Sequence, residues 1–195
     1  KTTIVVALNG CGWWLNMRGF EIVSTKVNDG LNLPKRSTQV AAGYDFEASE
    51  EIVIPSALSN PFFRGLNILS LGKLKNVRDD EDLQGLLKPV LVPTGIKAYM
   101  GEGEYLQLVS RSSGPIKKRL MMPNAVGIVD ADYYNNPSNE GEIFFQFINF
   151  GLKDVVIKKG ERIGQGIFLP YLLADGDDQV EKAERQGGFG STGQN

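Results

Sequence analysis

The fold and the chemistry of this protein are decided by the stretch NAVGIVDADY, which spans residues 124–133. Apolar residues lead up to a carboxylate, and an aromatic residue follows three positions later. Side chains alternate between the faces of a β-strand, so Ile128 and Asp130 should share one face and Val129 should lie on the other. The pattern predicts a strand that ends in a turn at Asp130. Aspartates are also common turn formers, so these residues alone leave a plain hairpin open.

Composition limits what the chain can be. It has 195 residues, of which 42% are hydrophobic and 23% charged, as expected for one ordinary globular domain. The net charge of -2 offers no basic field for long nucleic acid, so we predict no nucleic-acid partner. No apolar run approaches the roughly 20 residues needed to cross a bilayer. We therefore predict no membrane partner and a cytoplasmic location.

The titratable residues narrow the chemistry further. The sequence has 0 histidines and 1 cysteine, Cys11, which excludes a disulfide framework, a Cys/His zinc site and Ser-His or Cys-His nucleophilic catalysis. Acid–base chemistry must then use Asp, Glu, Lys or Tyr. A bound metal must be a hard ion with oxygen ligands.

Short apolar segments between glycines and prolines predict an all-β protein. The expected strands lie at residues 21–24, 51–54, 90–92, 104–109, 143–150, 155–157 and 163–169. Residues 79–87 form the one helix-like segment, with acidic residues at its start. Many short strands of this kind favour a sandwich, a jelly roll or a small barrel.

The two ends of the chain differ from the middle. Residues 1–16 are apolar but lack a convincing signal-peptide cleavage site, so we interpret them as an extension, with Met17 as the natural start of the fold. We expect the β domain to span residues 17–180. Residues 181–195 contain the run GGFGSTG. Its composition fits either a flexible tail or a phosphate-binding arm in which Phe189 stacks on a base.

Two further clusters are candidate anion or metal sites. Arg111, Ser112 and Ser113 follow an expected strand and offer one cation and two hydroxyls. Asp45 follows Gly43, which permits a close backbone approach. Each cluster also fits an ordinary polar turn.

Taken together, these pieces resemble the trimeric dUTPase family, in a form similar to Gram-positive and phage members that carry an insertion. Five motifs occur in the family's order: AGYD at 42–45, RSS at 111–113, residues 124–133, RIGQ at 162–165, and GGFGSTG at 187–193. The resemblance covers roughly residues 31–193. It implies a dUTPase-like β jelly roll that forms a homotrimer with shared active sites and a C-terminal glycine-rich arm. It also implies Mg²⁺-dependent cleavage of dUTP to dUMP and diphosphate, which keeps uracil out of DNA and supplies dUMP for dTMP synthesis.

The resemblance assigns a role to each site residue. Asp130 would activate a water for attack at the α-phosphorus, and Tyr133 would pack under the deoxyribose and exclude a 2′-hydroxyl. Asn124 and the backbone at Gly127 would pair with uracil, and Asp45 would hold Mg²⁺ through water. The remaining substrate-binding residues would contact the phosphates or cover the base, and they are Arg111, Ser112, Ser113, Gln165, Arg185, Phe189, Gly190, Ser191 and Thr192.

This chain departs from the family pattern in three places. Residues 134–140 lengthen the turn after Tyr133, and Arg185 lies one position closer than usual to the Gly-Gly pair. Residues 57–88 form an apolar insertion, which we interpret as a flap or a trimer contact. The alternative is a docking surface for another protein, such as a repressor.

Two other functions are compatible with parts of the pattern. A dCTP deaminase, alone or as a bifunctional deaminase/dUTPase, shares the Arg-Ser-Ser cluster. However, Gln146 stands where the deaminase relatives have a catalytic glutamate. A nucleotide-sensing protein that binds without chemistry would have no need of a base at Asp130. We therefore favour a dUTP-cleaving enzyme over these two functions.

Overall fold

The computed structural model describes residues 17–56 and 88–179. The extension at 1–16, the insertion up to residue 87 with its expected helix, and the C-terminal arm lie outside the described residues. The domain boundaries and the roles of Arg185, Phe189, Gly190, Ser191 and Thr192 therefore stay predictions.

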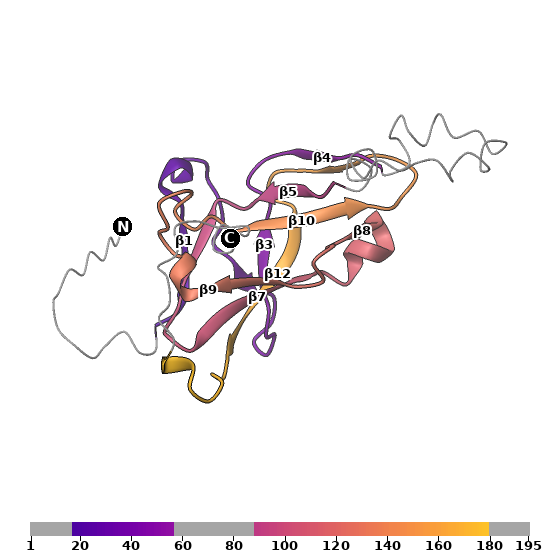
Figure 1. The fold of residues 1–195 in the computed structure, drawn as a ribbon. Coiled ribbons are helices and arrows are strands. Elements are labelled where there is room, and N and C mark those ends of the chain that lie inside the picture. Colours follow the sequence, from indigo (N-terminus) through magenta and orange to yellow (C-terminus); the bar gives the residue numbers. More distant parts are fainter. Residues whose placement is uncertain (1–16, 57–87, 180–195) are drawn as a thin grey trace, which may run out of the picture.

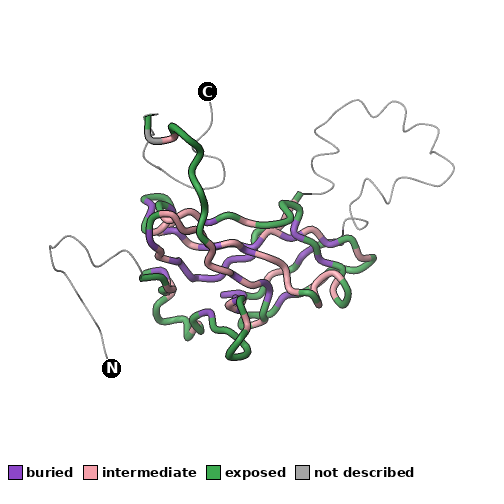
Figure 2. The backbone as a smooth tube through the Cα atoms, turned by 90° about the horizontal axis from the view of Figure 1, so that it is seen from below, coloured by how far each residue is buried: buried purple, intermediate pink, exposed green. Residues whose placement is uncertain are grey.

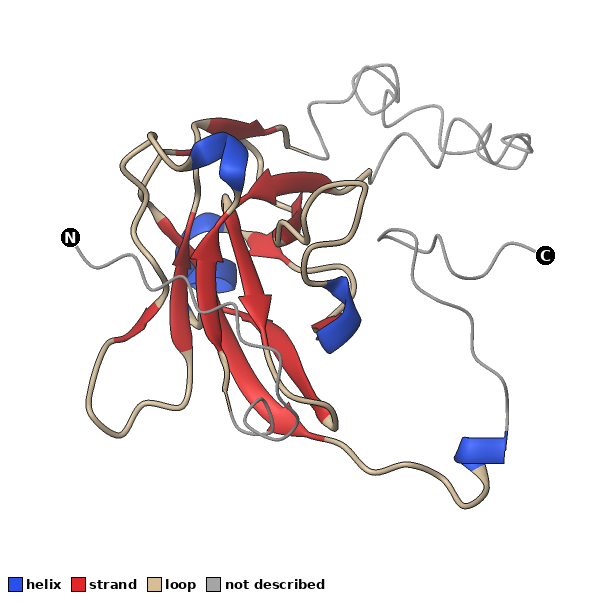
Figure 3. Cartoon of the chain, turned by 90° about the vertical axis from the view of Figure 1, so that its left-hand side faces the viewer, coloured by secondary structure: helices blue, strands red, loops and turns tan. Residues whose placement is uncertain are grey.

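The described chain is almost entirely strand, with only short helical turns between strands (Figure 3). Its strands are β1 (Gly19–Ile22), β2 (Lys35–Arg36), β3 (Tyr44–Glu47), β4 (Ile52–Ile54), β5 (Val90–Pro93), β6 (Ile96–Tyr99), β7 (Glu104–Ser110), β8 (Leu120–Met121), β9 (Gly127–Asp130), β10 (Phe144–Asn149), β11 (Val155–Ile157) and β12 (Arg162–Pro170). The turns are the 3-10 helices η2 (Ser24–Lys26), η6 (Ala131–Tyr133) and η7 (Asp177–Gln179), and the π-helix η5 (Gly114–Lys118).

The strands form four antiparallel groups. The largest is a five-stranded sheet in the order β2-β3-β12-β7-β9. A three-stranded sheet, β5-β10-β8, and the pairs β11-β4 and β1-β6 complete the structure. Strands β10, β5 and β4 lie on the opposite side of the molecule from β7 and β9 (Figure 1). This arrangement confirms the expected all-β architecture.

The core fills the space between these layers, where buried segments face one another (Figure 2). Phe46 of the five-stranded sheet and Phe145 of β10 are both 0% exposed, and their ring centroids are 5.7 Å apart. Leu106 and Val92, also fully buried, join the same cluster. Burial of these side chains supplies the main driving force for packing the two sheets together.

Gly164 on β12 is the point of closest approach between the two layers. A Cβ atom built at this position would lie 1.9 Å from Cε1 of Phe145. The ring of Phe145 therefore rests directly on the backbone of β12 and occupies the place of a side chain. This contact allows β10 to pack against the large sheet.

Most expected strands are present, and the strand at residues 155–157 has the predicted bounds. The alternation in β9 is also confirmed, because Val129 is 7% exposed whereas Ile128 is 55% exposed. The expected strand at 21–24 begins and ends two residues earlier. Its last two positions form the turn into η2, where the amide of Lys26 donates to the carbonyl of Val23 at 3.0 Å.

After β12 the chain leaves the sheets. The amide of Tyr171 donates to the carbonyl of Gly103 at 2.9 Å. Residues 171–176 are then exposed up to η7, and Figure 3 shows this segment running away from the strands.

Within residues 17–56 and 88–179, none of the helices combines the length and the apolar character needed to span a membrane.

Candidate active site

Asp130 lies at the end of β9, as the sequence predicts. Strand β9 pairs with β7, and Asp130 is directly opposite Tyr105. Burial of Val129 holds the strand against the core, while the Asp130 side chain shares the face of the exposed Ile128 and is itself half-buried. The backbone under the carboxylate is thus fixed, and the carboxylate remains accessible to water.

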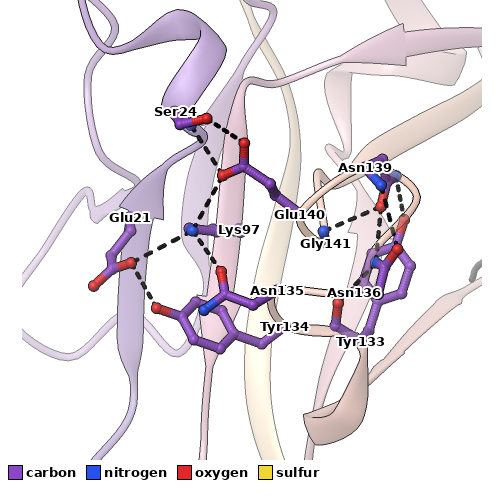
Figure 4. Close-up of polar contacts among 10 residues, drawn as sticks. All are labelled: Glu21, Ser24, Lys97, Tyr133, Tyr134, Asn135, Asn136, Asn139, Glu140 and Gly141. Atoms are coloured by element: carbon purple, nitrogen blue, oxygen red, sulfur yellow. Dashed lines mark hydrogen bonds and ion pairs between the residues drawn. The ribbon is translucent and has the colours of Figure 1, made fainter. Parts of the chain in front are cut away.

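Tyr133 follows in η6 and is held at both of its ends (Figure 4). Its side chain is 8% exposed. The phenol donates to the carbonyl of Glu142 at 3.0 Å and accepts from Nδ2 of Asn139 at 2.8 Å. The carbonyl of Tyr133 accepts from Nδ2 of Asn136 at 2.9 Å. The ring therefore has a defined position, three residues after Asp130 in the chain.

Asn124 and Gly127 lie at the other end of β9. Asn124 is exposed, and its carbonyl accepts from the amide of Val126 at 2.5 Å in a tight turn. Gly127 begins the strand opposite Leu108, and an added Cβ would meet that side chain at 3.2 Å. The small residue keeps the main chain of β9 close to β7 and leaves its polar groups at the sheet edge.

A second group of polar residues gathers around Asp45 on β3, which is only 6% exposed. Its carboxylate accepts from Oγ of Ser37 at 2.5 Å and from Nη1 of Arg162 at 3.1 Å. It also accepts from Nε2 of Gln165 at 3.0 Å, and Nε of Arg111 is 3.9 Å away. We call these five residues the Asp45 cluster. Four of the five come from the family motifs, whereas Ser37 carries no signal in the sequence.

The cluster keeps Asp45 ionised. Burial alone would raise the pKa of Asp45, because the charged form loses contact with water. Hydrogen bonds from Ser37 and Gln165, followed by that from Arg162, act in the opposite direction. With the positive charge of Arg111 added, the net pKa of Asp45 lies below its ordinary value. Asp45 thus stays charged and fixes the position of two arginines.

A pocket lies next to the Asp45 cluster; its charged side chains are mostly basic, and the rest of its lining is largely apolar. It is lined by Ser110, Arg111, Ser113, Lys117, Lys118 and Arg162, among other residues. Lys118 forms an ion pair with Glu161, whereas Ser112 is exposed and does not line the pocket. Cations and hydroxyls around one concave surface suit an anion with several oxygens. Sequence reasoning missed Lys117 and Lys118, which lie four and five positions after the end of the Arg-Ser-Ser motif.

The structure does not bring Asp130 and the Asp45 cluster together within one chain. Asp45 pairs with Gln165, which pairs with Val109 of β7, whereas Asp130 pairs with Tyr105 of β7. With ~3.3 Å per residue along β7 and about 4.8 Å between strands, Asp45 and Asp130 are roughly 20 Å apart. The candidate site is therefore divided between two ends of the sheet.

The lengthened turn after Tyr133 is fastened by a buried lysine. Lys97 on β6 is 9% exposed, and its Nζ donates to Oδ1 of Asn135 at 2.6 Å. The same Nζ lies 3.4 Å from Glu140 and 3.9 Å from Glu21 (Figure 4). It is also 5.1 Å from the centre of the Tyr134 ring, a favourable cation–π distance. The turn is thus tied to β1 and β6.

Tyr134 should titrate unusually late in this environment. Burial, then the hydrogen bond to Glu21 and the charge of that carboxylate, raises the pKa of Tyr134 to about 12. This pKa in the folded protein exceeds the ordinary value of about 10. The protonated phenol of Tyr134 therefore stabilises the fold fully below pH ~10, and this contribution is lost as pH rises through 12. We expect one late step in a tyrosinate absorbance titration that Tyr134→Phe removes. Loss of a step near pH 10 instead would contradict this.

Known proteins are similar to this chain in sequence and in fold. A sequence model of the dUTPase family matches residues 78–193. The chain is 47% identical over 179 residues to deoxyuridine 5'-triphosphate nucleotidohydrolase of Lactococcus lactis subsp. lactis (strain IL1403), which covers 92% of this chain and 99% of that protein. The protein of the same name from Heliobacterium modesticaldum (strain ATCC 51547 / Ice1) is 31% identical, with 84% and 90% covered.

Solved structures of dUTPases have a fold similar to that of this chain. The crystal structure of dUTPase from Streptococcus mutans matches with a TM-score of 0.63 and 42% identity, covering 81% of this chain and 99% of that chain. The dUTPase of phage phi11 of S. aureus, at 16% identity and a TM-score of 0.57, covers 89% of this chain and 100% of that chain, and it shares the fold. The motifs, the fold and these matches lead to one conclusion. This chain belongs to the dUTPase family.

Proposed function

We propose that this protein is a dUTP pyrophosphatase that hydrolyses dUTP to dUMP and diphosphate in the cytoplasm. The observation that carries the proposal is the placement of Asp130 at the end of β9, followed three residues later by the buried Tyr133 in η6, in a chain of this family. A carboxylate on a fixed backbone, followed closely in the chain by a held aromatic ring, suits a base that works next to a sugar.

The reaction needs a base and an anion clamp. Asp130 would accept a proton from a water molecule whose oxygen attacks the α-phosphorus. The bond from the α-phosphorus to the bridging oxygen then breaks, and diphosphate leaves with its electron pair. Arg111, Ser112, Ser113 and Gln165 would hold the phosphate chain, since arginine and hydroxyl donors strengthen their bonds as charge develops on its oxygens.

Base and sugar would be recognised at β9. Asn124 and the backbone at Gly127 would pair with the uracil edge, because the donors and acceptors of a paired strand have fixed positions. The buried ring of Tyr133 would pack against the deoxyribose and leave no room for a 2′-hydroxyl. Phe189 and Gly190 of the arm would cover the base, while Arg185, Ser191 and Thr192 would reach the phosphates.

Mg²⁺ would act through the triphosphate. Among the described residues no three His, Cys, Asp or Glu side chains gather as a metal site. The carboxylate of Asp45 is engaged by its cluster, which fits an outer contact through water and not a direct ligand. The dUTPase of phage phi11 of S. aureus coordinates a structural Mg(II) ion, which supports use of the metal here. When bound, Mg²⁺ would neutralise phosphate charge.

The divided site supports a homotrimer with shared active sites. Within one chain, Asp130 and the Asp45 cluster are separated by roughly 20 Å along and across the strands, too far for one triphosphate to contact both closely. A closed ring of identical chains would place the Asp130 of one copy beside the Asp45 cluster of a neighbour. The arm at residues 181–195 would then close over the joined site. We still interpret residues 57–88 as a flap or a trimer contact or, alternatively, as a docking surface for another protein.

Two alternatives can be separated from the enzyme. Gln146 lies on β10 opposite Leu91, and an amide there cannot act as the carboxylate base of a dCTP deaminase. A nucleotide-sensing protein would bind dUTP without turnover.

The test is diphosphate release from dUTP, dCTP, dTTP and UTP in the presence of Mg²⁺. We expect release from dUTP alone, because the β9 edge selects uracil and Tyr133 excludes ribose. Chelation of Mg²⁺ should suppress it. Ammonia from dCTP would instead establish a deaminase, and tight dUTP binding without diphosphate would establish a sensor.

A further inference from the structure

Asn139 makes the contact that fixes the phenol of Tyr133. Its Nδ2 donates to the Tyr133 hydroxyl at 2.8 Å, and its Oδ1 accepts from Nδ2 of Asn136 at 2.8 Å and from the amide of Gly141 at 3.1 Å. Both ends of this amide are therefore occupied. It cannot rotate without losing several bonds, so it holds the hydroxyl in one place.

Asn136 holds the opposite end of Tyr133. It is 5% exposed, and its Nδ2 donates to the Tyr133 carbonyl at 2.9 Å while its Oδ1 accepts from Oγ of Ser138 at 2.6 Å. Gly141, at φ +82°, closes the turn against the same carbonyl, where a Cβ would lie 2.5 Å from the oxygen. One turn thus holds both the backbone and the side chain of Tyr133 (Figure 4).

The turn itself is tied to the rest of the fold. Lys97 binds Asn135 and Glu140 at its two ends, and Glu140 also accepts from the amide of Ser24 at 3.1 Å. A turn that only connected β9 to β10 would not need a buried cation and an ion pair. These anchors make it a rigid support.

We propose that the turn at residues 134–141 is a positioning element for sugar selection, with Asn139 as its main positioning residue. The inference rests on the proposed function, in which Tyr133 excludes the ribose 2′-hydroxyl. Steric exclusion depends on where the ring lies to within a fraction of an ångström, because repulsion between atoms rises steeply with overlap. A group that holds the phenol therefore sets the discrimination between dUTP and UTP.

The test is Asn139→Ala, with kcat/KM measured separately for dUTP and for UTP. We expect the ratio of the two values to fall about three- to tenfold, the effect of losing one hydrogen bond that positions the ring. The ratio does not depend on how much of the enzyme is folded, so a purely structural role for Asn139 would leave it unchanged. A melting curve shows separately how far the fold is weakened.

Two comparisons sharpen the result. Ser56→Ala removes a side-chain hydrogen bond outside this turn, from the Ser56 hydroxyl to the carbonyl of Gly151, and it should leave the ratio unchanged. Tyr133→Phe removes this bond from the other partner of Asn139, together with the bond from the phenol to the Glu142 carbonyl, so adding Asn139→Ala to Tyr133→Phe should change the ratio little further. Tyr133→Phe also tests the proposal if Asn139→Ala does not fold.

The outcomes separate the two proposals. Absence of dUTP cleavage by the unaltered protein would overturn the proposed function. Normal dUTP cleavage with an unchanged dUTP-to-UTP ratio in Asn139→Ala and Tyr133→Phe would overturn the positioning role alone. Fully additive effects of the two substitutions would do the same, because they would show that the two side chains act independently.

Discussion

Asp130→Asn is expected to lower kcat for dUTP cleavage by about 10²- to 10⁴-fold, the usual contribution of a general base. The amide keeps the size and the strand position of the carboxylate but cannot take a proton from water. KM for dUTP should change little, because the phosphates, the sugar and the base are held by other residues. Steady-state diphosphate release with Mg²⁺ measures both constants.

Asp132→Asn is the matched control. Asp132 lies two residues further along, in η6, and is exposed. The same loss of charge in the same stretch should leave kcat close to that of the unaltered protein. Equal losses for the two variants would mean that local charge, and not proton transfer at Asp130, supports the reaction.

The divided site provides a second control. Asp130→Asn chains and Arg111→Ala chains should each be inactive, but co-assembled from the denatured state they should regain about one quarter of full activity by random assortment of copies. The recovered sites would take Asp130 from one copy and Arg111 from another. A mixture no more active than its parents would show that each chain builds its own site.

Gly164→Ala should cost about 3 kcal/mol of the free energy of unfolding, at the upper end of overpacking effects. The new methyl group would occupy the place of the Phe145 ring, 1.9 Å from its Cε1, and neither strand can withdraw without losing core contacts. For a chain of this size, that corresponds to a melting temperature lower by ~6–12 °C. Thermal and denaturant unfolding both measure it.

Gly114→Ala is the control for this prediction. Gly114 has an ordinary φ, and the nearest atom to its added Cβ would be 3.9 Å away, so its melting temperature should hardly change. In a Phe145→Leu background the cost of Gly164→Ala should fall, because the smaller side chain leaves room for the methyl group. An unchanged cost in that background would refute a clash with Phe145 as the cause.

Much of the fold follows from local sequence. Alternation alone predicts that Val129 faces the core while Ile128 faces out, and the structure confirms it. Strand β11 also has the predicted bounds, since Asp154 and Lys158 border a short apolar run. Such segments are readable because the period of a strand depends only on the backbone.

Strand β6 was not predicted, and its residues explain why. Ile96, Lys97 and Ala98 are all buried, so both faces of the strand are covered and no alternation remains. A lysine normally argues for an exposed position. Here the cation is buried because Glu21, Asn135 and Glu140 come to it from other parts of the chain.

The sequence by itself determined which residues could carry the chemistry. Without histidine, the base must be Asp, Glu, Lys or Tyr, and the resemblance of the five motifs to the dUTPase family implies Asp130 as that base. The same resemblance implies that Tyr133, Arg111, Gln165 and Asp45 surround the substrate. Residue type alone limits what each side chain can donate, accept or exclude, and the resemblance supplies the assignment of roles.

Only the tertiary structure decided how these residues are combined. It gathers Arg111, Arg162 and Gln165 around Asp45, yet places Asp130 at the other end of the sheet. It also joins Asn139 to the phenol of Tyr133 through a turn whose sequence shows no such role. The physical reason is that hydrogen bonds and ion pairs form between groups that are close in space, and strand pairing brings together residues that are more than 100 positions apart in the chain.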